Sequence, residues 1–184
     1  MPVAVDPFFW QVARWLLAGV FAAALWHKWR GRREFAAVVD DYRLLPAGTA
    51  PIAAALIMLL EGLVFVGLTS GIGLRPAAML AISLLFAYFL AITVNLLRGR
   101  RDMDCGCLGP AGGAAGRHRL SGWLLVRNAL LIGVAVMLLA PTTGRDLLWL
   151  DLASIVPGAS VGLLIYFTAD QLIANRPILE SLLQ

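Results

Sequence analysis

The two cysteines of the chain stand two residues apart, and this spacing is the first feature that could carry chemistry. Cys105 and Cys107 flank Gly106 in the segment Asp104-Cys105-Gly106-Cys107-Leu108-Gly109-Pro110. Glycine relaxes the dihedral demands of a tight ring, so the two thiols can close a small disulfide. A strained, accessible disulfide is easily reduced, which favours thiol–disulfide exchange over structural stapling. Cys105 and Cys107 are therefore the candidate catalytic residues.

Two other interpretations of the cysteines stay open. In one, Cys105, Cys107, His118 and Asp104 supply four metal ligands, although zinc sites usually space their paired cysteines by two to four residues. We therefore expect no metal. In the other, the cysteines are inert residues of a turn. Nearby arginines favour the thiolate, whereas Asp102 and Asp104 oppose it.

A second candidate site lies within apolar sequence. Glu61 stands near the middle of the apolar run at 51–70, and Arg127 stands near the start of the run at 122–141. A helical rise of about 1.5 Å per residue places them at depths of about 15 Å and 9 Å. Charged residues at such depth usually face the bundle interior with a partner. We predict a contact between Glu61 and Arg127, which fixes helix register or forms a proton relay or ligand site; the alternative is a lone, protonated Glu61.

Three further polar residues stand near the ends of apolar runs. Asn95 and Asn128 flank the same ends of the third and fourth runs, where they could bond across helices or orient the loop between them. They complete the predicted polar membrane site. Asp170, near the end of the last run, could meet Arg98 or Arg127, and no chemistry is assigned to it. The sequence contains no nucleotide-binding loop, Ser-His-Asp set or pair of catalytic carboxylates.

The elements that position these residues must be membrane helices. The 184 residues are 60% hydrophobic and 14% charged, with a mean hydropathy of +0.82, whereas soluble domains are about 45–50% apolar and about 25% charged. This composition excludes a disordered chain, a fibrous protein and an ordinary soluble domain. A span needs about 20 apolar residues. We therefore predict one integral membrane domain over 1–184, an all-α bundle of about five transmembrane helices at 9–27, 51–70, 76–97, 122–141 and 150–173.

The basic residues predict the orientation of this bundle. The predicted loops at 28–50 and 98–120 each contain five lysines or arginines, whereas the links at 71–75 and 142–149 contain one each. Cytoplasmic loops carry the excess of basic residues. This pattern predicts a multi-pass protein with its N-terminus outside, its C-terminus in the cytoplasm and both long loops, including the cysteines, in the cytoplasm. The expected partner of the basic residues is the bilayer, with no role for nucleic acid.

Glycines and one proline modify the apolar runs. Gly158 and Gly162 form a GxxxG pair, as do Gly67 and Gly71. Small residues at this spacing let helices approach closely, which predicts packing within the bundle, with homodimerisation as the other interpretation. Pro157 frees a backbone carbonyl, and we expect a kink there.

The region after the third apolar run resembles the methylamine-utilisation protein MauE family, which is similar to the DoxX-like membrane proteins. The resemblance covers roughly residues 10–140. It implies a four-helix DoxX-like core plus a C-terminal helix in the bacterial inner membrane, and a redox-associated role in maturation or transport of the methylamine dehydrogenase small subunit. The matching residues are Asp104-Cys105-Gly106-Cys107-Leu108-Gly109, Leu120-Ser121 and Val126-Arg127-Asn128, with Lys28, Glu34-Phe35, Tyr42, Leu44-Leu45-Pro46 and Glu61 upstream.

Three functional hypotheses follow. In the first, Cys105 and Cys107 exchange disulfides with a thioredoxin-like or other redox partner during maturation of an exported protein. In the second, the chain is a non-enzymatic membrane subunit or assembly factor. In the third, it is a quinone-linked thiol oxidoreductase with a pocket lined by Glu61, Arg127 and aromatic residues; a quinone is the one cofactor considered. Cytoplasmic cysteines would need a second carrier to reach an exported substrate across about 30 Å of hydrocarbon.

Overall fold

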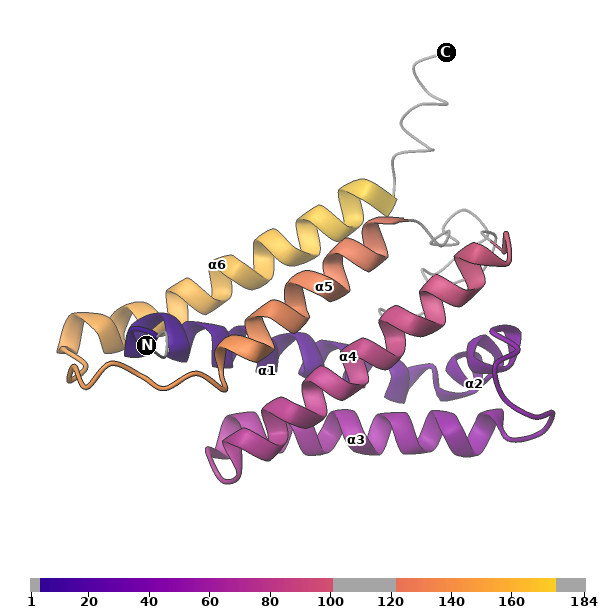
Figure 1. The fold of residues 1–184 in the computed structure, drawn as a ribbon, viewed down its shortest axis with the longest axis horizontal. Helices are drawn as coiled ribbons and strands as arrows, with labels where there is room; N and C mark the ends of the chain where they lie inside the picture. The colour runs from indigo at the N-terminus through magenta and orange to yellow at the C-terminus, as the bar shows by residue number, and fades with distance from the viewer. Residues whose placement is uncertain (1–3, 101–121, 175–184) are drawn as a thin grey trace, which may run out of the picture.

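Six helices form the part of the chain that the computed structural model describes, residues 4–100 and 122–174 (Figure 1). The only other regular pairing within these residues is an isolated bridge between Val5 and Thr142. The predicted all-α membrane fold is confirmed, since α1, α3, α4 and α6 are each long and apolar enough to span a bilayer and α5 is a shorter apolar helix. The helices are α1 (Pro7–Arg30), α2 (Arg32–Asp41), α3 (Ala50–Ser70), α4 (Leu74–Leu97), α5 (Gly122–Met137) and α6 (Trp149–Ala174).

The helix ends follow local chemistry. Asp6 caps α1 by accepting a hydrogen bond from the Phe8 backbone nitrogen at 2.9 Å, and proline occupies the next position, where its missing N–H costs nothing. α3 ends at Gly71, whose φ of 77° is left-handed and suits glycine. α5 ends at Met137, four residues before the end of the predicted span, and α6 continues through Pro157.

The loop predicted at 28–50 was wrong over much of its length. α1 continues to Arg30, and α2 then occupies Arg32–Asp41. Phe35 is buried and Val38 is half-buried, while charged residues take the outer face of this short helix. Apolar residues at 35, 38 and 42 follow the helical period. The stretch is too short and too polar to span the bilayer, so a search for apolar runs passes over it.

The long helices alternate in direction and pack around α1. α1 contacts α3, α5 and α6, while α4 contacts α3 and α5, and α2 lies on α3. Consequently the end of α1, the start of α3, the end of α4, the start of α5 and the end of α6 all lie at the same end of the bundle as α2 (Figure 1, right). We call this the α2 end.

The outer surface of the bundle fits lipid contact. Large apolar side chains are exposed along every long helix, among them Leu59 of α3, Leu130 of α5 and Leu164 of α6. Trp26 and Trp29 are exposed at the α2 end of α1, whereas Trp149 is exposed at the opposite end. Exposed indole rings at both ends match the aromatic belts of membrane proteins. The chain is therefore a multi-pass protein in a lipid bilayer.

The glycine pairs pack within the chain, as predicted, with one difference. A Cβ on Gly162 would lie 2.6 Å from Leu16 Cδ1, so α6 meets α1 closely at this point. A Cβ on Gly67 would lie 2.6 Å from the Cβ of Ala77, which joins α3 to α4. Gly71 instead ends α3 in a left-handed conformation.

Replacing Gly67 by alanine is expected to destabilise the bundle by about 1–3 kcal/mol, because the opposing Ala77 Cβ is fixed to its backbone and cannot turn away. The matched control is Gly133→Ala in α5, where no atom of another described helix lies within 4 Å of the new Cβ. That change should be neutral or stabilising, by up to about 1 kcal/mol, because it removes a helix-interior glycine. Thermal unfolding of both variants in the same detergent measures the difference. Equal stability of the two variants would contradict the close α3–α4 contact.

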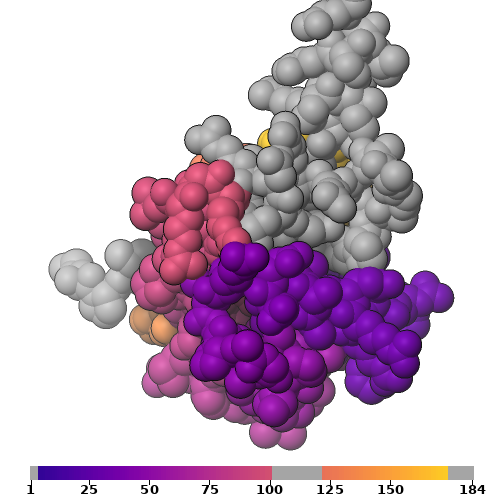
Figure 2. Space-filling view, turned by 90° about the vertical axis from the view of Figure 1, so that its right-hand side faces the viewer, coloured from indigo at the N-terminus to yellow at the C-terminus, as the bar shows by residue number. Residues whose placement is uncertain are grey.

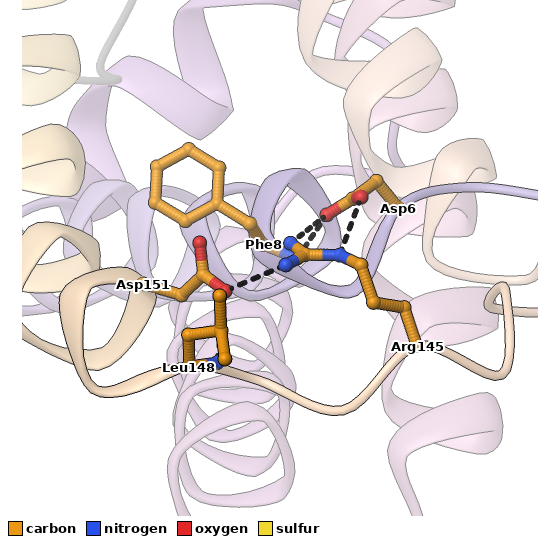
Figure 3. Close-up of polar contacts among 5 residues, drawn as sticks. All are labelled: Asp6, Phe8, Arg145, Leu148 and Asp151. Atoms are coloured by element: carbon orange, nitrogen blue, oxygen red, sulfur yellow. Dashed lines mark hydrogen bonds and ion pairs between the residues drawn. The ribbon is translucent and has the colours of Figure 1, made fainter.

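At the end opposite α2, one arginine links the start of the chain to the start of α6 (Figure 3). Arg145 donates from Nε and Nη2 to the Asp6 carboxylate at 3.1 Å and 3.0 Å, and from Nη1 to Asp151 Oδ2 at 2.9 Å. The hydrogen bond from Arg145, with that from the Phe8 backbone, holds the pKa of Asp6 below its usual range. Asp151 also accepts from the Leu148 backbone nitrogen at 3.0 Å.

The lowered pKa predicts a pH dependence at this end. A carboxylate with a depressed folded-state pKa stabilises the fold above its unfolded pKa of about 3.9, and this contribution is lost as pH falls through the lowered value. The unfolding temperature of the native chain should therefore exceed that of Arg145→Gln near neutral pH, and the gap should close below a pH of about 4. The control is Arg75→Gln, which removes an exposed arginine at the same end. A gap that stays constant down to a pH of about 2.5 would refute the linkage.

Candidate functional site

A buried ion pair joins three helices. Lys28 Nζ of α1 donates to Glu61 Oε1 of α3, and the Tyr88 hydroxyl of α4 donates to the same oxygen at 2.7 Å. The Lys28 and Glu61 side chains are each 1% exposed. A charge buried in this way must be paired, because an isolated one is costly.

The Lys28 ammonium also lies beside two aromatic rings. It lies 5.0 Å from the ring centroid of Phe35 and 4.9 Å from that of Tyr88, within the range of cation–π attraction. Phe35 belongs to α2, so the short helix that the sequence prediction omitted helps to enclose the charge. Glu61 Oε2 is buried and has no hydrogen-bond partner among the described residues.

A second buried ion pair joins α5 to α6. Arg127 Nη1 and Asp170 Oδ1 lie 2.9 Å apart, and each side chain is 4% exposed. The Arg127 guanidinium carbon also lies 5.9 Å from the ring centroid of Tyr166. Of the two partners left open for Asp170, Arg98 and Arg127, the structure shows Arg127.

Lys28 and Glu61 of the first pair and Arg127 of the second line one small cavity of about 30 Å³, whereas Asp170 does not contribute to its lining. Since a water molecule needs at least about 10–15 Å³ of such space, one or two waters fit. A pocket lined by Glu61, Arg127 and aromatic residues is therefore present, as predicted. Its volume fits water molecules and is too small for a quinone ring. All five long helices contribute to it: Val20, Phe21, Ala24, Lys28, Glu61, Leu85, Tyr88, Arg127, Asn128, Leu131, Tyr166 and Phe167.

The predicted contact between Glu61 and Arg127 was wrong, because Glu61 pairs with Lys28 and Arg127 pairs with Asp170. The sequence prediction placed Lys28 in a loop, whereas α1 continues past it. A signal was present: Lys28 follows the buried Leu17 by eleven residues and Phe21 by seven, which are spacings that share a helix face. Extending the apolar face of α1 by one turn would have placed Lys28 inside.

The two asparagines bond within their own helices. Asn128 Nδ2 donates to the Leu124 carbonyl at 2.8 Å, and Asn95 Nδ2 donates to the Ala91 carbonyl at 3.1 Å. Asn128 lines the cavity, whereas Asn95 is buried elsewhere, toward the end of α4. Of the four predicted membrane-site residues, the cavity thus brings together Glu61, Arg127 and Asn128.

Cys105 and Cys107 lie outside the described residues, as do His118 and Asp104. Within residues 4–100 and 122–174, no group of three or more His, Cys, Asp or Glu side chains is placed to hold a metal ion. The structure does place the two points between which the cysteine segment runs. They are Arg100, after α4, and Gly122, the start of α5, and both lie at the α2 end (Figure 1).

Fold and site together define an all-helical, multi-pass membrane protein with two ion pairs at its centre. Within that class the chain belongs to the MauE family, because the model of methylamine utilisation protein MauE matches residues 6–141. The chain is 37% identical to methylamine utilization protein MauE of Paracoccus versutus over 174 residues, 92% of this chain and 90% of that one. The MauE proteins of Methylorubrum extorquens and Paracoccus denitrificans are 33% and 35% identical, over 94% and 72% of this chain and 91% and 69% of theirs. No solved structure matches the chain.

Proposed function

We propose that this protein acts in methylamine utilisation as a membrane component of thiol–disulfide exchange, in the maturation of an exported protein of the methylamine dehydrogenase type. Membership of the MauE family supports the metabolic setting. The Cys105-Gly106-Cys107 sequence supports the chemistry, because two thiols around a glycine can close and reopen a disulfide.

The exchange proceeds through a mixed disulfide with a redox partner, for which a thioredoxin-like protein is the expected class. One cysteine thiolate attacks a sulfur of the partner disulfide, and the partner's other sulfur leaves as a thiolate. The second cysteine thiolate then attacks the mixed disulfide. The Cys105–Cys107 bond forms and the partner leaves as a dithiol, so two electrons and two protons pass to the partner. The reverse sequence oxidises the partner.

The observation that carries the proposal is the position of the two buried ion pairs relative to the segment that contains Cys105 and Cys107. That segment joins Arg100 to Gly122 at the α2 end, and Arg127 follows Gly122 by five residues, about 7.5 Å along α5. One ion pair, with the Tyr88 hydroxyl, joins α1, α3 and α4, and the other joins α5 to α6. In the proposed function these contacts hold α4 and α5, the two helices that the cysteine segment connects, in place within the bundle.

The experiment traps the mixed disulfide in cells. Cys105→Ser and Cys107→Ser should each reduce maturation of the exported disulfide protein to background, and one of them should accumulate an adduct that reductant dissolves. The double variant is the control and should give no adduct. Normal maturation in both single variants, or an adduct that persists in the double variant, would exclude the exchange function.

A non-enzymatic subunit or assembly factor is the second candidate. The pairing of all four central charges favours it, since such networks can serve only to specify helix packing. It predicts that the cysteine variants support normal maturation. Quinone-linked exchange would need a site other than the 30 Å³ cavity. Labelling of Cys105 and Cys107 from each side of the membrane tests the predicted cytoplasmic placement.

A further inference from the structure

A larger cavity lies between α2, α3 and α4 at the α2 end, and Tyr88 lines both this cavity and the smaller one beside the ion pairs. It is open on one side and has a volume of about 280 Å³, and all its lining side chains are aliphatic or aromatic. The lining includes Phe35 and Tyr42 from the α2 region, Ile57 of α3, and Leu84, Tyr88 and Ile92 of α4. No charged side chain lines it, so the cavity suits a hydrocarbon group.

The cavity has the depth of a lipid chain. Along α4 its lining extends from Leu84 to Ile92, which is about 12 Å at about 1.5 Å per residue. Ile92 lies five residues before Leu97, where α4 ends, so the cavity begins about 8 Å from the helix end. It therefore extends from near the interface into the hydrocarbon region.

Three arginines gather where the cavity approaches the interface. Arg98 Nη1 lies 3.4 Å from the carbonyl oxygen of Arg43, and Arg100 Nη1 donates to the Asp41 carbonyl at 3.1 Å. Arg43 stands between the lining residues Tyr42 and Leu44. Figure 2 faces this end, with α2 and the residues after it (purple) beside the end of α4 (pink).

These arginines keep their charge available. Within the described residues Arg98 and Arg100 each contact one backbone carbonyl, and each guanidinium has five N–H groups, so most of their donors are open there. The exposed Asp40 and Asp41 oppose the positive charge but form no ion pair with these arginines within the described residues. Guanidinium groups bind phosphate oxygens strongly, and basic pockets at the membrane surface bind anionic headgroups.

We propose that the cavity binds one acyl chain of an anionic phospholipid whose phosphate group lies on Arg43, Arg98 and Arg100. The apolar cavity accounts for the chain, and the arginines account for the negative headgroup. A zwitterionic lipid lacks the net charge, and free phosphate lacks the chain. Because Phe35 and Tyr88 line the cavity and also contact Lys28, a bound chain would pack against the residues that enclose the central ion pair.

The preference for an anionic headgroup is tested by native mass spectrometry of the full-length protein in detergent. The protein is titrated with phosphatidylglycerol or with phosphatidylcholine that carries the same acyl chains. The native protein should bind phosphatidylglycerol more tightly. Arg43→Gln and Arg98→Gln should each weaken that binding about fivefold. Arg75→Gln, with the same charge loss at the opposite end, should not. Equal affinity for the two lipids, or unchanged affinity in the Arg43→Gln/Arg98→Gln double variant, would overturn the proposal.

Binding of the acyl chain is tested by filling the cavity. Ala91→Phe places a ring in the space and should lower phosphatidylglycerol binding at least tenfold. Ala55→Phe is the control, because it adds the same ring to an exposed face of α3. Glycerol phosphate should not compete at the lipid concentrations that saturate the protein. Competition by glycerol phosphate, or full binding to a folded Ala91→Phe variant, would show that no chain enters the cavity.

Discussion

Replacing Glu61 by alanine is expected to destabilise the bundle by about 3–5 kcal/mol, one of the two largest effects of a single substitution that we predict. The change would leave the Lys28 ammonium buried without a countercharge. Tyr88 could still contact it at 3.3 Å, but a hydroxyl does not neutralise a charge. Three helices meet at this pair, so the loss should appear as cooperative unfolding of the whole bundle.

Denaturant or thermal unfolding in one fixed detergent measures this effect. The double variant Lys28→Met/Glu61→Leu removes both charges while keeping the volume, and it should recover most of the stability, because replacing a buried pair with apolar residues is often neutral. Glu34→Ala, which removes an exposed acid of α2, is the control and should change stability little. A double variant less stable than Glu61→Ala would show that the pair stabilises beyond mutual neutralisation.

Replacing Arg127 by methionine is expected to cost a similar 3–5 kcal/mol. Asp170 is buried, and within the described residues it forms its ion pair with Arg127. α6 packs chiefly on α1, so this ion pair is a main link between α5 and α6 within the described residues. Its loss should loosen the α2 end of α6 first, and hydrogen exchange of the α6 backbone should rise before global unfolding.

A double variant again separates the cost of one unpaired buried charge from the contribution of the ion pair itself. Arg127→Met/Asp170→Leu should recover stability, and Arg75→Met is the control for loss of an exposed arginine. Unchanged exchange in α6 of the Arg127→Met variant would contradict the proposed link. Combining this double variant with Lys28→Met/Glu61→Leu gives a folded, uncharged centre. If that protein fails in maturation while binding partners normally, the central charges do more than hold the helices.

The positions of the long helices were predictable, because insertion of a helix into lipid depends on the total hydropathy of its own segment. Each of the five apolar runs is a helix, and the predicted ends differ from the observed ones by a few residues. Glu61 and Arg127, whose predicted depths differ by about 6 Å, do line one cavity. Depth follows from a helix's own length, so it needs no knowledge of neighbouring helices.

The pairing of charges depended on the tertiary structure. Lys28, Glu61 and Arg127 line the same cavity, and Asp170 lies 2.9 Å from Arg127, so their charges alone allow more than one pairing. Which pair forms depends on how α1 and α6 are rotated about their axes and on where α1 ends. That rotation is set by contacts along whole helices, such as Gly162 against Leu16. A linear sequence specifies which residues must be buried, whereas the packing of all five long helices decides which buried residues meet.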